Sequence, residues 1–282
     1  FYFFAQKYGF IFSSEIISFL QISDIKNSLK LNLDSINEYL SLNYLTNDKT
    51  FFKNVKSLKP ASYILLDSKN FGPNIKTKKY WFLENYFINK TNDNFKQASE
   101  KINSLIKQSI KQKMFSDVEN GVFLSGGIDS SAISLNLKEI DNHLMSAHNI
   151  SFKEEKFNEA KDAKIIAEHL DLKLKHYQIP NDIEFVKEFP KIIDAMDEPM
   201  SDTSFVSTYY LSKYSVKNSK VALSCDGADE IFGGYDTYIA DIYRNFLPKI
   251  NFNLFKNLPN KIFKTNLSKV GLDYKFNKFI NG

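Results

Sequence analysis

The sequence predicts an α/β fold with a parallel sheet, preceded by a smaller region of short strands. From residue 95 onward, strands alternate with helices long enough to cross back over a sheet, which favours parallel strands covered on both faces. Two of these strands, at 121–125 and 220–224, lead directly into loops that contain glycines and acids. Ligands bind at the carboxyl ends of the strands in such sheets, so we expect the site there.

The length and composition predict a globular protein of two domains. Of the 282 residues, 43% are hydrophobic and 25% are charged, which is ordinary for a folded chain. Single cores stop growing at roughly 250–300 residues, so two domains are expected. We place the boundary near residue 90, in the polar segment "NKTNDNF" at 89–95. The predicted domains are therefore 1–90 and 91–282.

The first domain is predicted to hold short strands and one or two helices. "YGFIFSS" predicts a strand, and "SSEIISFLQIS" predicts a helix that begins at a serine cap, with Glu15 in its first turn. Residues 34–45 have apolar side chains at helical spacing behind Asp34, which we expect to be a cap. A further strand is expected at 61–67.

The second domain is predicted to alternate helices with strands. The expected helices are 95–113, 130–141, 158–170, 184–196 and 204–218. The expected strands are 121–125, 144–152, 174–179 and 220–224.

The charge and residue usage disfavour several classes of protein. The net charge is +4, and Arg244 is the one arginine in the chain. Because proteins that read nucleic acid rely on arginine side chains, no nucleic-acid partner is expected. No apolar run approaches the ~18 residues of a membrane span. The single cysteine, Cys225, excludes an internal disulfide and favours the cytoplasm. The four histidines lack zinc-site spacing, so we expect them to be satisfied or on the surface.

The segment "SGGIDSS" at 125–131 has the properties of a phosphate-binding loop. Gly126 and Gly127 permit left-handed backbone angles and close approach of a ligand. A helix that begins near Ser130 offers unpaired N–H groups and a positive dipole end, and the serine hydroxyls add donors. Asp129 is expected to bind a divalent cation that bridges the phosphates. The segment lacks the Gly-Lys-Ser/Thr of a Walker A loop, and its alternative interpretation is a simple tight turn.

A second loop, "LSCDGADEIFGGY" at 223–235, follows another predicted strand. Asp226, Asp229 and Glu230 place three carboxylates within a short stretch at a helix start. The alternative interpretation is a helix N-terminus at which acids favour the dipole. Two such loops on parallel strands of one sheet predict a shared nucleotide and metal site.

Several segments resemble one known family. "SGGIDSS" resembles the pyrophosphate loop of the ATP pyrophosphatase (PP-loop) superfamily. "SCDGADEIFGGY" is similar to the signature of the glutamine-hydrolysing asparagine synthases, and "DEPMSDTS" at 197–204 resembles their D-E-P-x-x-D segment. "GFIFSSEI" and "TFFKNVKSLKPASYILLD" resemble the closing strands of that family's glutaminase domain. The resemblance covers nearly the whole chain.

The resemblance implies a fold and a reaction. Residues 91–282 would form a parallel-sheet PP-loop domain of the adenine nucleotide alpha-hydrolase kind, incomplete at its C-terminus. Residues 1–90 would be the C-terminal portion of an N-terminal-nucleophile glutaminase (glutamine amidotransferase type 2) domain. The implied enzyme uses ATP and Mg²⁺ to adenylate aspartate, which releases pyrophosphate, and ammonia from glutamine then attacks β-aspartyl-AMP to give asparagine. A homodimer is implied as well.

The family pattern also implies roles for individual residues. Those expected to hold the pyrophosphate are Ser125, Gly126, Gly127, Ser130 and Ser131. Those expected to border the nucleoside are Leu124, Ile150, Ser224 and Cys225. Asp129 and Asp229 match the magnesium ligands, and Asp226 and Glu230 match acids that line the reaction chamber.

The chain departs from the family pattern in three ways. The N-terminal cysteine nucleophile and the C-terminal basic segment are absent, so we expect a fragment cut at both ends. Cys225 stands where the family has glycine, and its alternative interpretation is a small buried residue at a strand end. Two other functions stay open: a PP-loop ligase of the β-lactam synthetase type, and a nucleotide-binding homologue that has lost its catalysis.

Overall fold

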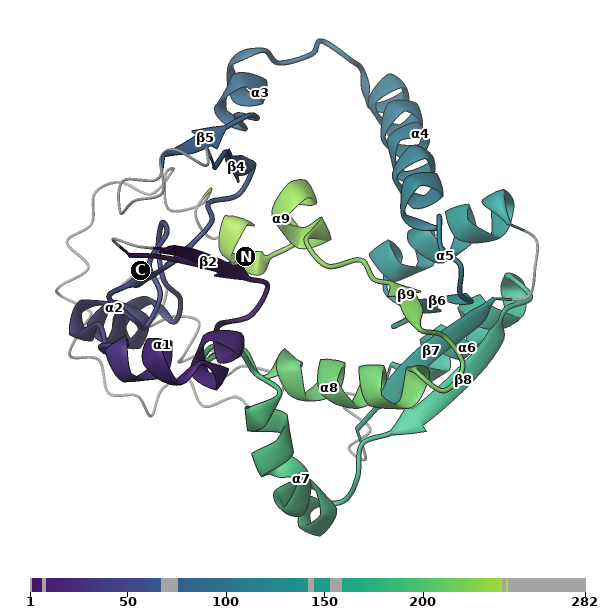
Figure 1. Cartoon of the computed structure of the whole chain (residues 1–282). Coiled ribbons are helices and arrows are strands. Elements are labelled where there is room, and N and C mark those ends of the chain that lie inside the picture. Colours follow the sequence, from purple (N-terminus) through teal and green to yellow (C-terminus); the bar gives the residue numbers. More distant parts are fainter. Residues whose placement is uncertain are drawn as a thin grey trace, which may run out of the picture. The chain divides into compact units, whose positions relative to one another are not determined.

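The computed structural model describes residues 2–6, 9–66, 76–141, 145–152, 159–239 and 242. The chain divides into two compact units, Phe1–Ser224 and Cys225–Gly282. The domain boundary predicted near residue 90 falls inside the first unit and stays a prediction. Figure 1 labels most of the helices and strands.

The first unit begins with short antiparallel strands. They are β1 (Tyr2–Gln6), β2 (Gly9–Ser13), β3 (Val55–Ser57), β4 (Ser62–Ile64) and β5 (Thr77–Lys79). Within the described residues, β2-β1-β3 form one sheet and β4-β5 another. The short helices here are η1 (a 3-10 helix, Ile16–Gln21), α1 (Ser23–Ser28) and α3 (Glu84–Ile88). A small core joins the first sheet to η1 and α1 through Ile16, Phe19, Ile25 and Val55.

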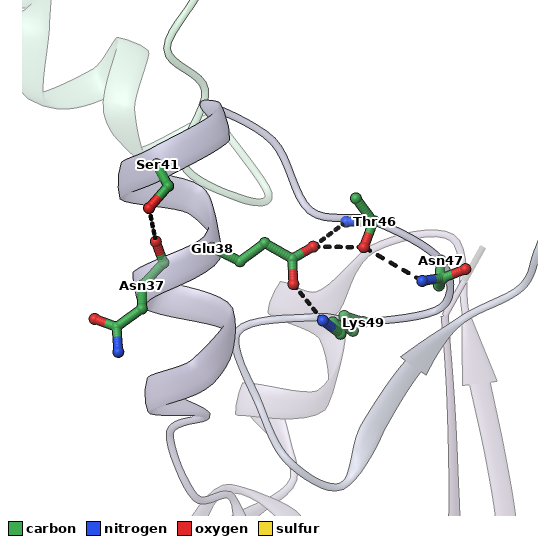
Figure 2. Close-up of polar contacts among 6 residues, drawn as sticks. All are labelled: Asn37, Glu38, Ser41, Thr46, Asn47 and Lys49. Carbon is green, nitrogen blue, oxygen red and sulfur yellow. Dashed lines mark hydrogen bonds and ion pairs between the residues drawn. The ribbon is translucent and has the colours of Figure 1, made fainter.

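Helix α2 (Leu33–Leu42) is tied to the loop that follows it by Glu38, as Figure 2 shows. One carboxylate oxygen accepts from the backbone N–H and the hydroxyl of Thr46, at 2.7 and 2.6 Å. The other oxygen pairs with the Lys49 ammonium. The Lys49 contact and then those of Thr46 lower the pKa of Glu38 to about 2. The helix ends at Asn43, whose left-handed φ of 68° turns the chain into this loop.

A parallel sheet forms the centre of the predicted second domain. Its strands are β6 (Asn120–Phe123), β7 (Ser146–Ser151), β8 (Lys173–Gln178) and β9 (Val221–Leu223). Among the described residues they pair in the order β8-β7-β6-β9, and every pair is parallel. The connecting helices are α4 (Phe95–Lys113), α5 (Ile128–Ile140), α6 (Ala160–His169), α7 (Asp182–Asp194) and α8 (Ser204–Ser215).

Both faces of this sheet are covered, as the strand pattern predicts. On one face Val122 and Ala147 pack into an apolar core that includes Leu137 of α5 and Ala163 of α6. On the other face the His148 ring stacks on Tyr177, whose ring lies 5.3 Å from that of Tyr214 on α8. Because side chains alternate along a strand, consecutive residues of β7 serve the two faces.

The predicted elements differ from the observed ones mainly at their ends. Helix α4 matches its predicted range, and Asn94 and Gln97 form a capping box at its start. The helix predicted near Glu15 is a 3-10 helix followed by the short α1. The predicted serine cap is wrong, because the N-cap residue is Glu15, which was expected in the first turn and makes no side-chain cap bond. Asp34 is wrong as a cap: it lies in the first turn of α2, behind Asn32. The last residue of the strand predicted at 61–67 lies outside the described residues.

Candidate functional site

The glycine loop joins the end of β6 to the start of α5. Leu124 is 1% exposed, and its backbone N–H donates to the His148 carbonyl at 2.9 Å, which continues the pairing with β7. The chain then turns at Gly126, where φ is 90°, and Gly127 is the N-cap of α5. The loop therefore lies at the carboxyl end of a parallel strand, where the sequence predicts a ligand.

The two glycines of the loop are not equivalent. A β-carbon on Gly126 would lie 2.6 Å from the Ala163 nitrogen and 2.7 Å from the Asp162 β-carbon, so the first turn of α6 packs directly against it. Gly127 has φ −69° and ψ 165°, and an added β-carbon would approach only Ser125 Oγ, at 3.3 Å. The prediction of left-handed angles is confirmed at Gly126. It is wrong at Gly127, because an N-cap residue takes extended angles.

The serine hydroxyls of the loop bond to the loop itself. Ser130 Oγ donates to the Gly127 carbonyl at 3.2 Å, and Ser125 Oγ lies 2.9 Å from Ser130 Oγ. Since Ser130 has one hydroxyl proton, Ser125 is the donor of that second bond. Ser131 Oγ also donates to the Gly127 carbonyl, at 2.7 Å. These bonds brace the turn, and Ser130 is only 2% exposed. Phosphate binding by the three hydroxyls stays a prediction.

The start of α5 carries the backbone donors of the loop. Helical bonding begins when the Ser131 N–H donates to the Gly127 carbonyl at 3.0 Å. The N–H groups of Ile128, Asp129 and Ser130 precede that bond and are oriented out of the helix N-terminus. The helix dipole adds partial positive charge at the same place, which suits an anionic oxygen.

The acidic loop is held in a defined shape within the second unit. Helix α9 (Ala228–Phe232) begins after Gly227 at φ 91° and ends at Gly233 at φ 70°. The Tyr235 hydroxyl donates to Glu230 Oε1 at 2.8 Å, and this bond raises the pKa of Tyr235 to about 12. The Asp229 carboxylate lies against Gly234, since a β-carbon there would overlap Asp229 Oδ1. Gly234 thus leaves room for that carboxylate.

The structure brings one set of the predicted site residues together. Leu124, Ser125, Gly126, Gly127, Asp129, Ser130 and Ser131 share the glycine loop. Ile150 lies on β7, two residues after His148, which accepts the Leu124 bond. Ser224 ends the first unit, directly after β9, which pairs with β6. The second unit holds Cys225, Asp226, Asp229 and Glu230. That these residues complete the same site stays a prediction.

The donor groups fit magnesium. Carboxylate oxygens are ligands that this hard cation prefers, and both Asp129 and Asp229 offer them. Among the described residues, no three His, Cys, Asp or Glu side chains gather as a ready metal site. Magnesium is usually held by one or two carboxylates together with phosphates and water. Asp129 and Asp229 belong to different units, and that they hold one ion together stays a prediction.

Within the same described part, no helix has both the length and the apolar character that a membrane span needs.

Polar residues of β7 and β8 that the sequence reasoning missed lie beside the loop. Asn149 Nδ2 donates to the Leu124 carbonyl at 2.7 Å, and His176 Nδ1 lies 2.9 Å from Asn149 Oδ1. His148 is fully buried between Ser219 Oγ, at 2.9 Å, and the Tyr177 hydroxyl, at 3.1 Å. The signal available in the sequence was the polar Asn149 in a strand that is otherwise expected to be buried. The expectation of satisfied histidines is confirmed for His148 and His176, whereas His143 lies outside the described residues.

Comparison with known proteins identifies both regions of the chain. The family model described as asparagine synthase matches residues 101–277, and the glutamine amidotransferase domain model matches residues 1–81. The chain is 31% identical to "Putative asparagine synthetase (glutamine-hydrolyzing) 2" of Methanocaldococcus jannaschii, over 89% of this chain and 47% of the relative. It is 30% identical to asparagine synthetase (glutamine-hydrolyzing) 1 of Bacillus subtilis, over 76% of this chain and 32% of the relative. The chain thus spans less than half the length of these relatives.

Among solved structures, an ammonia-dependent NAD synthetase from Campylobacter jejuni matches 51% of this chain and 61% of its own. The TM-score is 0.33 and the sequence identity is 18%, so nothing about the site follows from this match. The asparagine synthase model, by contrast, covers more than half of the chain. The chain belongs to the asparagine synthase family.

Proposed function

We propose that the protein containing this chain is a glutamine-hydrolysing asparagine synthase. The reaction joins the phosphorus of the ATP α-phosphate to the side-chain carboxylate of aspartate and releases pyrophosphate. Ammonia, released from glutamine by the amidotransferase domain, then displaces AMP and gives asparagine. The family supports the use of ATP. The acceptor and the nitrogen donor are proposed from the names of the relatives.

The observation that carries the proposal is the turn at Gly126. Its φ of 90° turns the chain from the end of β6 into α5, and Gly127 and Ile128 at the start of that helix are exposed. Three backbone N–H groups, of Ile128, Asp129 and Ser130, are oriented out of that terminus. Pyrophosphate leaves more easily when its negative charge is stabilised, and fixed backbone donors give that stabilisation without reorganisation.

The acids are assigned to the remaining roles. Asp129 and Asp229 would hold Mg²⁺, which supplies positive charge that neutralises the departing pyrophosphate. Asp226 and Glu230 would line the reaction chamber. Leu124, Ile150, Ser224 and Cys225 would border the nucleoside. In this proposal the protein acts in the cytoplasm as a homodimer, with small-molecule substrates and no nucleic-acid or membrane partner.

The test is pyrophosphate release by the full-length protein. We expect release only when ATP, Mg²⁺ and aspartate are all present, and we expect asparagine when glutamine or ammonia is added. Glutamate replaces aspartate as the control acceptor, because it has the same charge and one more methylene group. Equal pyrophosphate release without any amino acid, or with glutamate alone, would overturn the asparagine assignment.

A further inference from the structure

The peptide group between Leu124 and Ser125 is held from both sides. On one side its carbonyl accepts from Asn149 Nδ2 at 2.7 Å. On the other side its N–H, which belongs to Ser125, donates to Ser130 Oγ at 3.3 Å. A trans peptide is planar, with its C=O and N–H pointing in opposite directions, so these two bonds fix the orientation of the plane. This peptide leads into Ser125, the residue before Gly126, so its orientation sets the direction in which the loop begins.

The hydrogen bonds that end at this carbonyl run in a single direction. A carbonyl only accepts, so the Asn149 side chain must present its NH₂ group to Leu124 and its oxygen to His176. That oxygen also only accepts, so His176 Nδ1 carries the proton across their 2.9 Å contact. In the neutral ring Nε2 is then an acceptor, and the Ser151 hydroxyl, 3.0 Å away, donates to it. The order of donation is Ser151, His176, Asn149, Leu124.

Burial gives this arrangement its strength. Asn149 and Ser151 are each 3% exposed, and Leu124 is 1% exposed. Water therefore has little access to the bond between Asn149 and the Leu124 carbonyl. If the Asn149 donor were removed, no water would replace it, and a buried carbonyl without a hydrogen bond is destabilising. His176 lies on an exposed position of β8. We therefore expect its replacement to disturb the core less than a change at Asn149.

We propose that Asn149 is a positioning residue of the nucleotide site. It holds the Leu124 carbonyl, and thereby the first peptide of the glycine loop, while the Nδ1–H of His176 keeps its amide facing the right way. The proposal rests on the proposed function, because the glycine loop is the ATP site in that function. Neither side chain is assigned a contact with ATP.

Substitutions in the full-length protein separate positioning from folding. Asn149→Asp keeps the shape and the acceptor for His176 but places an oxygen against the Leu124 carbonyl. His176→Leu removes the donor to Asn149. His176→Asn restores it, because the Asn amide nitrogen occupies the place of Nδ1. Gln178→Leu is the matched control, since Gln178 is exposed two residues further along β8. The measurements are calorimetric binding of ATP–Mg²⁺, kcat and KM for pyrophosphate release, and thermal unfolding.

We expect Asn149→Asp to lower kcat/KM for ATP by about 10–100-fold, as small misplacements of binding groups do. His176→Leu should weaken ATP binding several-fold, whereas the ATP affinity of His176→Asn and of Gln178→Leu should remain within about two-fold of wild type. All three variants should have similar unfolding temperatures. If Asn149→Asp fails to fold, the His176 pair decides. Wild-type ATP affinity in Asn149→Asp or His176→Leu would overturn the proposal, as would equal losses in His176→Leu and His176→Asn. A wild-type protein that binds no ATP would overturn the proposed function, and the role of Asn149 with it.

Discussion

Gly126 and Ala163 lie so close that a β-carbon on Gly126 would come 2.6 Å from the backbone nitrogen of Ala163. The neighbour is main chain in the first turn of α6, which cannot swing aside as a flexible side chain would. A side chain at position 126 would therefore disturb both the packing of α6 and the turn of the glycine loop.

Gly126→Ala is accordingly expected to damage both stability and binding. Backbone strain at φ 90° and the contact with α6 should together lower the free energy of unfolding by about 2–4 kcal/mol. Gly127→Ala is the control, because its φ is −69° and the nearest atom is a serine hydroxyl at 3.3 Å. Urea unfolding and ATP calorimetry measure the two effects. Equal stability of the two variants would contradict this account.

Asp129→Asn and Asp229→Asn should each reduce pyrophosphate release by the full-length protein while leaving it folded. An amide oxygen is a weaker ligand for a hard cation than a carboxylate, and losing one stabilising group in such a site costs about 10²–10³ in rate. Asp117→Asn is the control, because Asp117 is exposed in the turn before β6. Activity equal to wild type in both variants, at every magnesium concentration, would remove these aspartates from the site.

The sequence was sufficient for the parallel sheet and for the glycine loop because both are local patterns. The lengths of the strands and helices and the segment "SGGIDSS" can be identified from neighbouring residues alone. The different roles of Gly126 and Gly127 were not predictable, because they depend on Ala163, which is far along the chain. The bond from Asn149 to Leu124 likewise follows from the register of β6 and β7, which no local motif encodes.

Glu38→Gln should remove a stabilising carboxylate whose effect depends on pH. The pairing with Lys49 and Thr46 lowers the folded pKa of Glu38 to about 2, below the unfolded value near 4.3. The stability that the ionised form contributes is present above the unfolded pKa and is lost as the pH falls toward the folded pKa. Thermal unfolding should therefore show the variant below wild type at neutral pH, with the gap closing in acid. Glu100→Gln, on the exposed side of α4, is the control. A gap that stays constant down to low pH would contradict the prediction.

Glu198→Gln should behave in the opposite way. The Tyr2 hydroxyl donates to Glu198 Oε2 at 2.8 Å, and burial, more than any neighbour, raises the pKa of Glu198. For such an acid the stability is fully present below the unfolded pKa and is lost as the pH rises through the folded pKa, because ionisation is costlier in the folded protein. Glutamine keeps an acceptor for Tyr2 without the charge. The variant should therefore gain stability relative to wild type as the pH rises above about 4.3.

A double-mutant cycle with Tyr2→Phe measures how far the Tyr2 hydroxyl offsets the effect of burial on Glu198, because its hydrogen bond lowers the pKa that burial raises. Removing the hydroxyl leaves the half-buried Glu198 carboxylate without this donor, and a hydrogen bond to a charged group contributes about 1.5–3 kcal/mol. Tyr2→Phe should therefore destabilise wild type at neutral pH more than it destabilises the Glu198→Gln variant, where the acceptor is neutral. Asp197, which precedes Glu198, makes a separate bond to η1: the Ile17 N–H donates to Asp197 Oδ1 at 3.0 Å. The two substitutions leave the groups of that bond in place, so the coupling energy reports the interaction between Tyr2 and Glu198. Additive effects of the two substitutions at neutral pH would show that the Tyr2 hydroxyl does not stabilise the ionised Glu198 carboxylate.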